Sequence, residues 1–218
     1  MSSRRQGVLL VVSGPSGVGK GTLIAGLLAR RPEVRVSVSC TTRPPRPGEV
    51  EGREYFFVSL EEFSRRREDG ALLEWAEVYP GLLYGTPRQA VEETLARGED
   101  LILEIDDQGA QSVRAALGER AVLVCVAPPS FAALHERLAG RRTESPESLR
   151  ERLATAHGEI ANMGRYDYVI INREVEPAVE ALEAVLLAER HSLRFAGWQA
   201  LQSRLLAEAA DEEGSAHG

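Results

Sequence analysis

The chain has 218 residues and a formal net charge of −7, which argues against nucleic acid as its main partner. No apolar run approaches the roughly 20 residues of a membrane span. The two cysteines, Cys40 and Cys125, fit no zinc or redox spacing, and the four histidines form no metal-spaced cluster. These features favour an enzyme of a reducing, cytoplasmic compartment.

A glycine-rich segment, GPSGVGKGT, lies between a buried strand predicted at 8–13 and a helix predicted at 22–31. Its glycines let backbone N–H groups surround phosphate oxygens at the start of a helix, whose dipole favours an anion. Lys20 is the only lysine among 26 basic residues, and its flexible point charge can follow a moving phosphoryl group. The segment predicts a nucleotide-binding loop formed by Gly14, Pro15, Ser16, Gly17, Val18, Gly19, Lys20, Gly21 and Thr22.

The loop departs from the usual pattern at one position. Gly21 stands where serine or threonine normally offers a hydroxyl to magnesium, and Thr22 is the first hydroxyl after the lysine. We therefore expect Mg²⁺ to be held mostly by phosphates and water, with no direct protein ligand assigned.

Residues 37–86 differ in composition from the rest and predict an insertion beside the core. A strand is predicted at 36–40, an aromatic strand at 53–58 and a charged helix around 61–69. Prolines stiffen the loop between the two strands, and two arginines with a tyrosine make a good phosphate clamp. These three residues are Arg43, Arg46 and Tyr55. The alternative is a surface loop with solvated arginines.

The remaining chain alternates strands and helices, as in an α/β nucleotide-binding core with a parallel sheet. Strands are predicted at 101–106, 121–127 and 168–172, with Ser130 capping one of the helices between them. The last helix is predicted to run from about 176 to 206, before an acidic tail at 207–218 that is predicted to be disordered. An arginine-rich stretch at 137–152 predicts a closing lid.

Together these segments resemble the guanylate kinase family. The resemblance rests on the glycine-rich loop, SCTTRPPRPGEVEGREYFF, LEWAEV, YGTP, LEIDDQGAQSVR and the arginine-rich stretch, in order from about residue 8 to 189. It implies a phosphate-loop kinase core over 1–36, 87–136 and 153–206, a GMP-binding α+β insertion over 37–86 and a helical lid over 137–152. It also implies ATP and GMP or dGMP as substrates, and Mg²⁺ with ATP.

The resemblance carries roles to single residues. On the GMP side it implies Ser39, Arg43, Arg46, Glu49, Tyr55, Glu74, Tyr84, Thr86, Glu104 and Asp106. It implies that the transferring phosphoryl group is contacted by Lys20, Arg46, Arg137, Arg141 and Arg152. It also implies that Asn172 contacts adenine. Glu74 would accept hydrogen bonds from the N–H groups of guanine, and Asp106 would reach the magnesium shell through water. The segment VYPGLLYG differs from the usual family sequence, so Tyr84 is matched on its following glycine alone.

Two other functions are compatible with parts of the sequence. One is a guanylate-kinase-like module that binds phosphopeptides without activity, and the other is a kinase of another small phosphorylated acceptor. Lys20 argues against the first, because such modules commonly lack a working phosphate loop. Glu74 and the acidic strand end argue against the second. We expect no nucleic-acid or membrane partner, and the sequence does not predict the oligomeric state.

Overall fold

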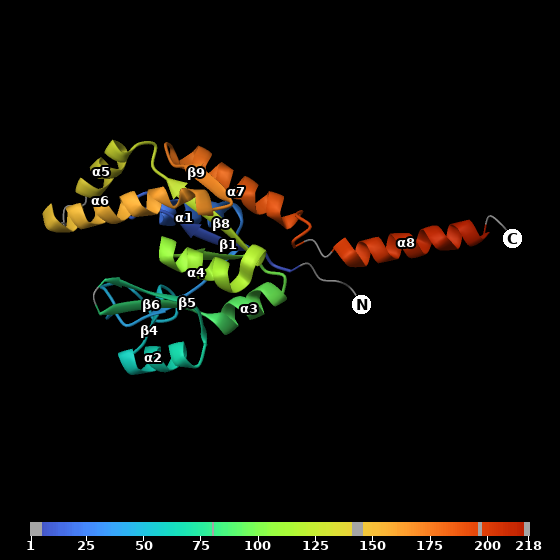
Figure 1. Cartoon of the computed structure of the whole chain (residues 1–218), viewed down its shortest axis with the longest axis horizontal. Helices are drawn as coiled ribbons and strands as arrows, with labels where there is room; N and C mark the ends of the chain where they lie inside the picture. Colours follow the sequence, from blue (N-terminus) through green and yellow to red (C-terminus); the bar gives the residue numbers. More distant parts are fainter. Residues whose placement is uncertain (1–5, 80, 141–145, 196–197, 216–218) are drawn as a thin grey trace.

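The computed structural model describes residues 6–79, 81–140, 146–195 and 198–215. Its core is a five-stranded parallel sheet in the order β2-β7-β1-β8-β9 (Figure 1). The strands are β1 (Leu9–Ser13), β2 (Arg35–Val36), β7 (Leu101–Glu104), β8 (Ala121–Ala127) and β9 (Tyr168–Ile171). Helices cover both faces of this sheet, which confirms the predicted fold class.

Alternate residues of β1 face opposite apolar clusters. Leu10 and Val12 pack with α1 (Lys20–Arg30) and α7 (Val175–Arg190) on one face. Leu9 and Val11 pack with α3 (Arg88–Ala96) and α4 (Asp107–Leu117) on the other. Because side chains alternate along a strand, an entirely apolar strand is stable only when both faces are covered.

A second, mixed sheet has the order β4-β3-β6-β5. Its strands are β3 (Ser39–Thr41), β4 (Tyr55–Phe57), β5 (Leu72–Tyr79) and β6 (Leu82–Pro87), and α2 (Leu60–Glu68) accompanies them. Phe63 of α2 packs with Cys40 in a small cluster of its own. Leu73 belongs instead to the core cluster that contains Val113 of α4. The small sheet is thereby fixed against α4, as Figure 1 shows.

The strand predicted at 36–40 is wrong as a single element. The chain leaves the core sheet after β2 and enters the small sheet at β3, so one alternating pattern spans two sheets. The β5–β6 hairpin was not predicted, although the dipeptide Pro80-Gly81 between the two strands is a turn signal.

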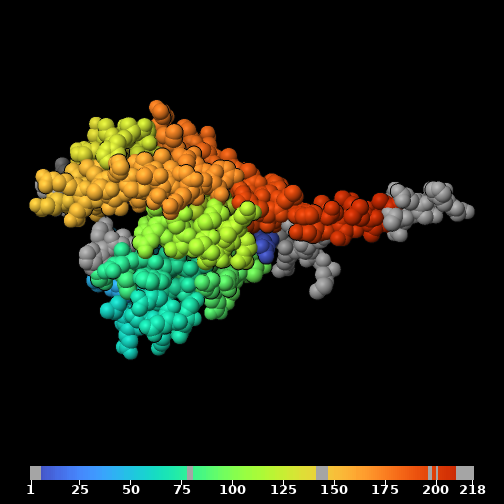
Figure 2. Space-filling model, in the orientation of Figure 1, coloured from blue at the N-terminus to red at the C-terminus, as the bar shows by residue number. Residues whose placement is uncertain are grey.

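The predicted lid, 137–152, overlaps the end of α5 (Phe131–Ala139) and the start of α6 (Pro146–Ala161). The side chain of Ser130 accepts a hydrogen bond from the N–H of Ala133, which confirms its predicted capping role. Leu134 and Leu138 pack with Ala156 in a separate apolar cluster that joins the two helices. In Figure 2 these helices and the small sheet stand apart as two lobes at one end of the molecule.

The carboxyl-terminal region differs from the expectation. The predicted long helix is two helices, since α7 ends at Arg190 and α8 spans Trp198–Ser215. Phe195 lies between them and is buried in the core, so the chain leaves the helix to place that ring. The predicted disordered tail is helical through Ser215, consistent with its alanine and glutamate content. Figure 1 shows α8 projecting from the body. Within the described ranges, no helix is both long and apolar enough to cross a membrane.

Candidate active site

The predicted phosphate loop joins β1 to α1 at the carboxyl edge of the parallel sheet, where α/β proteins bind ligands. Gly14 and Gly19 have φ values of 131° and 99°, which side chains rarely adopt. A β-carbon on Gly14 would lie 2.2 Å from the carbonyl oxygen of Val126, and one on Gly19 would lie 2.6 Å from the Asn172 amide nitrogen. Both positions therefore require glycine.

Lys20 begins α1 and turns back over its own loop. Its Nζ donates to the carbonyl oxygens of Gly14 and Pro15, the latter at 3.4 Å. Burial lowers the pKa of Lys20, while three nearby carboxylates raise it. These carboxylates belong to Glu104, Glu159 and Asp106. Lys20 thus lies within electrostatic reach of three carboxylates.

Arg137 and Asn172 are bound to the main chain of the donor side. Arg137 donates to the carbonyl oxygens of Val18 at 3.3 Å and Asn172 at 2.9 Å. The Asn172 amide nitrogen donates to Val18 at 2.8 Å. Its Oδ1 is buried and accepts no hydrogen bond from any residue that the structure describes. This oxygen is available to a donor on a bound molecule.

Arg152 lies on α6 and reaches the same loop from the lid. Its Nη1 lies 3.1 Å from the Ser16 Oγ and donates to it. Arg141, the other predicted lid arginine, lies outside the described residues, as does Arg142.

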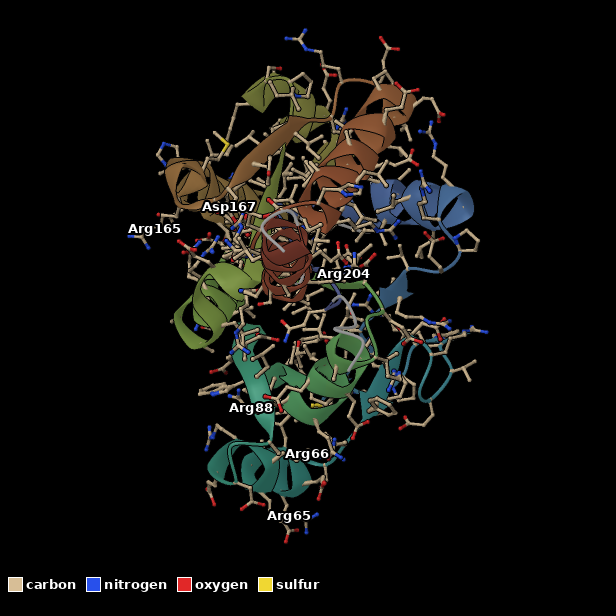
Figure 3. The ribbon with its side chains drawn as sticks, turned by 90° about the vertical axis from the view of Figure 1, so that its right-hand side faces the viewer. Arg65, Arg66, Arg88, Arg165, Asp167 and Arg204 are labelled. Atoms are coloured by element: carbon tan, nitrogen blue, oxygen red, sulfur yellow. The ribbon has the colours of Figure 1, made fainter. Side chains whose placement is uncertain are left out.

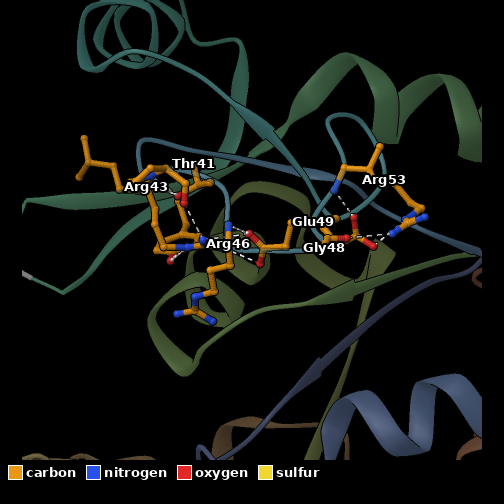
Figure 4. A network of polar contacts seen from close by, with 11 residues as sticks. Thr41, Arg43, Arg46, Gly48, Glu49 and Arg53 are labelled. Carbon is orange, nitrogen blue, oxygen red and sulfur yellow. Dashed lines mark hydrogen bonds and ion pairs between the residues drawn. The ribbon is translucent and has the colours of Figure 1, made fainter. Parts of the chain in front are cut away.

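The predicted clamp centres on an ion pair between Arg43 and Glu49 (Figure 4). The Arg43 guanidinium donates to both Glu49 oxygens, at 2.9 and 2.8 Å, and to the carbonyl oxygen of Pro44 at 2.7 Å. Only 8% of the Arg43 side chain is exposed. The Arg43 guanidinium also lowers the pKa of Glu49. Glu49 thus holds the arginine, and its predicted place in the GMP site stays a prediction.

Arg46 is held differently. Its main-chain N–H donates to Glu49 at 2.7 Å, whereas its guanidinium is exposed and points away from that carboxylate in Figure 4. The loop therefore offers one fixed guanidinium and one that is available.

Two tyrosines complete the clamp. Tyr84 Oη accepts from Arg43 Nε at 3.2 Å, and its ring meets the Tyr55 ring edge-on at 5.7 Å. The Arg43 guanidinium lies 5.4 Å from the Tyr55 ring centre. Burial raises the pKa of Tyr55. Ser39 pairs with Tyr55 across β3 and β4. The hairpin brings Tyr84 to the clamp although its turn sequence departs from the family pattern.

Glu74 lies on β5 with 6% of its surface exposed. The hydroxyl of Thr86 on β6 donates to it at 2.6 Å. A β-carbon on Gly109 would come within 2.8 Å of Glu74 Oε2. Burial, with a smaller contribution from the Asp106 charge, raises the pKa of Glu74 to about 7.

Glu104 is the last residue of β7, and Asp106 lies two residues beyond it. The Asp106 Oδ1 accepts from the Gly109 N–H at 2.8 Å and caps α4. Glu104 lies in the open cleft, where surrounding protein raises its pKa and the Lys20 charge lowers it. Its carboxylate is 3.7 Å from the place a β-carbon on Gly21 would take. Glu104 therefore stands between the phosphate loop and the small sheet.

The comparisons with known proteins agree on one family. The family model described as guanylate kinase matches residues 6–189. The chain is 54% identical to a guanylate kinase of Symbiobacterium thermophilum over 87% of this chain and 89% of that protein. It is 48% identical to a guanylate kinase of Maricaulis maris over 86% and 85%.

The chain belongs to the guanylate kinase family. A crystal structure of guanylate kinase from Anaplasma phagocytophilum superposes with a TM-score of 0.72 and 35% identity, over 91% of this chain and 94% of that one. The family resemblance in the sequence is therefore confirmed, and so is the enzyme class.

The side chains near the phosphate loop bear on how Mg²⁺ is bound. Within the described residues no group of three His, Cys, Asp or Glu side chains is arranged to hold a metal. Thr22 is exposed at the loop, and Gly21 brings no hydroxyl. Such a site fits an ion bound mainly through nucleotide phosphates and water.

Sequence reasoning missed a group of polar residues behind the cleft, namely Asp107, Glu159, Asn162 and Tyr166. One signal was available. Arg152 and Glu159 are seven residues apart on one helix, which places them on the same face. The other contacts join segments far apart in the chain, and no local pattern indicates them.

Many of the arginines lie outside the candidate active site. Arg65 and Arg66 lie on α2 and pair with Glu62, and Figure 3 shows Arg65 at the outer surface. Arg88 lies beside Glu92 at 3.8 Å on α3. Such exposed pairs contribute about 0–1 kcal/mol each to stability. The abundance of arginine is therefore mostly a surface property.

Proposed function

We propose that one side of this site binds ATP and the other binds GMP, so that the γ-phosphoryl group of ATP is transferred to GMP, giving ADP and GDP. The observation that carries the assignment is the buried carboxylate of Glu74 beside a preset arginine clamp, on a sheet separate from the Lys20 loop. One side suits a guanine nucleotide and the other a triphosphate.

On the donor side, the N–H groups of the glycine loop surround the ATP phosphates. Lys20 exchanges its bonds to loop carbonyls for bonds to phosphate oxygens, a change that needs only side-chain rotation. The buried Asn172 Oδ1 accepts from the adenine amino group. Arg137 fixes the loop and β9 through their main chains, so we assign it to holding the donor site.

On the acceptor side, ionised Glu74 accepts from N1–H and N2–H₂ of guanine, with Thr86 holding the carboxylate in place. Adenine offers no such pair of donors. The phosphate of GMP binds to the Arg46 guanidinium and to the one N–H of Arg43 Nη2 that Glu49 leaves over. The remaining contacts come from Ser39, Tyr55, Tyr84, Glu104 and Asp106.

In the transfer step, an oxygen of the GMP phosphate forms a bond to the γ-phosphorus, and the bond from that phosphorus to the β–γ bridging oxygen breaks. The electron pair stays on ADP, and no proton acceptor is required. Catalysis is then positioning and charge stabilisation. Arg152, together with Arg141, supplies positive charge as the lid closes and excludes water that would hydrolyse ATP.

Magnesium, when bound, neutralises charge on the transferring phosphates. Thr22 and Asp106 are the residues we assign to its surroundings, Asp106 through water because its Oδ1 is used in the helix cap.

The units of the molecule follow from these roles. Residues 37–86 bind the acceptor, and 137–152 form the lid on a core made of 1–36, 87–136 and 153–206. We place the enzyme in the cytoplasm, supported by two buried thiols that are both free, Cys40 and Cys125.

A coupled assay of ADP release tests the proposal across GMP, dGMP, AMP, CMP and UMP. We expect turnover with GMP and dGMP and at least about a hundredfold lower kcat/KM with the others, because a mismatched base leaves the buried Glu74 unpaired. Equal turnover with AMP would contradict the assignment of Glu74.

A further inference from the structure

One carboxylate behind the cleft joins three parts of the chain. Asp107 is the first residue of α4 and directly follows the helix cap Asp106. Its Oδ2 accepts from the Asn162 amide at 2.7 Å, and its Oδ1 accepts from the Tyr166 hydroxyl at 2.8 Å. Asn162 comes directly after α6, and Tyr166 follows the short helix η2 (Met163–Arg165). The end of the lid helix is thereby tied to the start of α4.

These bonds are stronger than ordinary surface contacts. All three side chains are partly buried, and a charged acceptor makes a hydrogen bond roughly twice as strong as a neutral pair. Burial raises the pKa of Tyr166, as does the neighbouring carboxylate, so its phenol stays a donor at working pH. Gln111 adds a weak third contact to Asp107 at 3.4 Å.

The tie lies at one end of a helix whose other part reaches the phosphate loop. Arg152 lies on α6, ten residues before Asn162, or about 15 Å along the helix. Because a helix moves as a unit, a shift at Asn162 also shifts Arg152, which lies 3.1 Å from Ser16 in the loop. A misplacement of 1 Å in a catalytic group can cost about a hundredfold in rate.

We propose that Asp107 is a positioning residue for the lid helix α6. It fixes the end of α6 against the start of α4, next to the strand end that carries Glu104 and Asp106. It contacts no substrate. It holds α6 in the register that lets Arg152 close over the transferring phosphoryl group. This inference rests on the role proposed above for Arg152.

The test starts with Asn162→Asp, which sets a second carboxylate against Asp107 at hydrogen-bond distance. We expect kcat to fall roughly 10–100-fold, with the calorimetric Kd for GMP unchanged within about threefold. The double variant Asn162→Asp with Asp107→Asn restores a donor–acceptor pair with its direction reversed. It should return kcat to within about threefold of the parent. Asp107→Asn alone should be mild, because the Asn162 amide can rotate to offer its oxygen.

Arg114→Gln is the matched control. Arg114 also ties α4 to the segment after η2, through Asp167, but at the far end of α4. Asp167 is held in addition by the Leu123 N–H at 2.8 Å. We expect Arg114→Gln and Asn162→Asp each to lower Tm by about 2–4 °C, and Arg114→Gln to leave kcat unchanged.

Three results would overturn the inference: parental kcat in Asn162→Asp, failure of the double variant to recover, or an equal loss of kcat in Arg114→Gln. Arg152→Ala, measured alongside, separates this inference from the role on which it rests. If Arg152→Ala keeps its kcat, the proposed lid role fails. If Arg152→Ala lowers kcat while Asn162→Asp does not, the lid role of Arg152 stands and only the positioning role of Asp107 is contradicted.

Discussion

The donor and acceptor sides of the cleft are built by different means. The donor side is mostly main chain, a glycine loop whose shape is enforced by close approach to Val126 and Asn172. The acceptor side is mostly side chains, brought together from four strands of a small sheet and held by each other. A substitution on the donor side should therefore affect one contact, whereas one on the acceptor side should disturb several. The following predictions test that contrast.

Lys20→Ala should give the largest loss. It removes the one side-chain cation of the phosphate loop, and we expect kcat to fall about 10²–10³-fold. The GMP Kd from calorimetry without ATP should stay at the parental value, because the clamp lies on the other sheet. Lys20→Arg should also have a low kcat, since the planar guanidinium of arginine does not replace the compact ammonium charge of lysine in this loop. Near-normal turnover by the alanine variant would contradict the donor assignment.

Glu74→Gln should come next. An amide offers one acceptor and turns an NH₂ toward the donors of guanine, so kcat/KM for GMP should fall roughly 10–150-fold. In the parent, kcat/KM for GMP should also rise with pH up to about 7, where the Glu74 carboxyl ionises. That rise should vanish in the glutamine variant. A parental pH profile in Glu74→Gln would show that another group reads the base.

The same carboxyl affects folding stability. Its pKa rises from 4.5 to about 7 on folding, so between these values the native state binds more protons than the unfolded state. Stability from this group is therefore present at low pH and is lost as pH rises to about 7. The loss is on the order of 3 kcal/mol. Urea unfolding at pH 5 and pH 8 should show a smaller difference for Glu74→Gln than for the parent.

The contrast between the two sides also explains what the sequence could predict. The glycine loop is contiguous, so its order of strand, loop and helix could be read directly and is confirmed. Arg43 and Tyr84 are 41 residues apart, and their hydrogen bond depends on how the β5–β6 hairpin pairs with β3, which a turn signal such as Pro80-Gly81 does not specify. Glu49 was assigned to the substrate because it lies in the right loop. That it binds Arg43 depends on side-chain geometry, which the pattern does not contain.

The tail shows another limit. Residues 207–215 were predicted to be disordered from their acidic, small composition, and they are helical. An acidic composition of small residues indicates that a segment cannot bury enough apolar surface to pack into a core. Alanine and glutamate nevertheless favour a helix even where the segment packs against nothing. The end of α7 was missed for the opposite reason, since burial of Phe195 overrides helix propensity after Arg190.

Arg43→Ala should raise the KM for GMP roughly 10–30-fold, with a smaller change in kcat, because it removes binding in both ground and transition states. It also leaves Glu49 as an uncompensated negative charge beside the phosphate. Arg43→Ala with Glu49→Gln should therefore recover part of the KM loss, which calorimetry with GMP can measure. No recovery would mean that Glu49 does not act through Arg43.

Gly21→Ser should have the smallest effect. Its backbone is not in the positive-φ region, and a β-carbon there would meet the Glu104 carboxylate at an ordinary contact distance of 3.7 Å. The new hydroxyl stands where phosphate loops usually offer a magnesium ligand. If it turns to the metal, the Mg²⁺ concentration for half-maximal activity should fall about two- to threefold with little change in kcat. If it donates to Glu104 instead, magnesium dependence stays parental and the KM for GMP rises, because Glu104 is shared with the acceptor side. Gly21→Ala, which adds the carbon without the hydroxyl, separates these effects from bulk. The substitution thus shows whether the two sides of the cleft meet at Glu104.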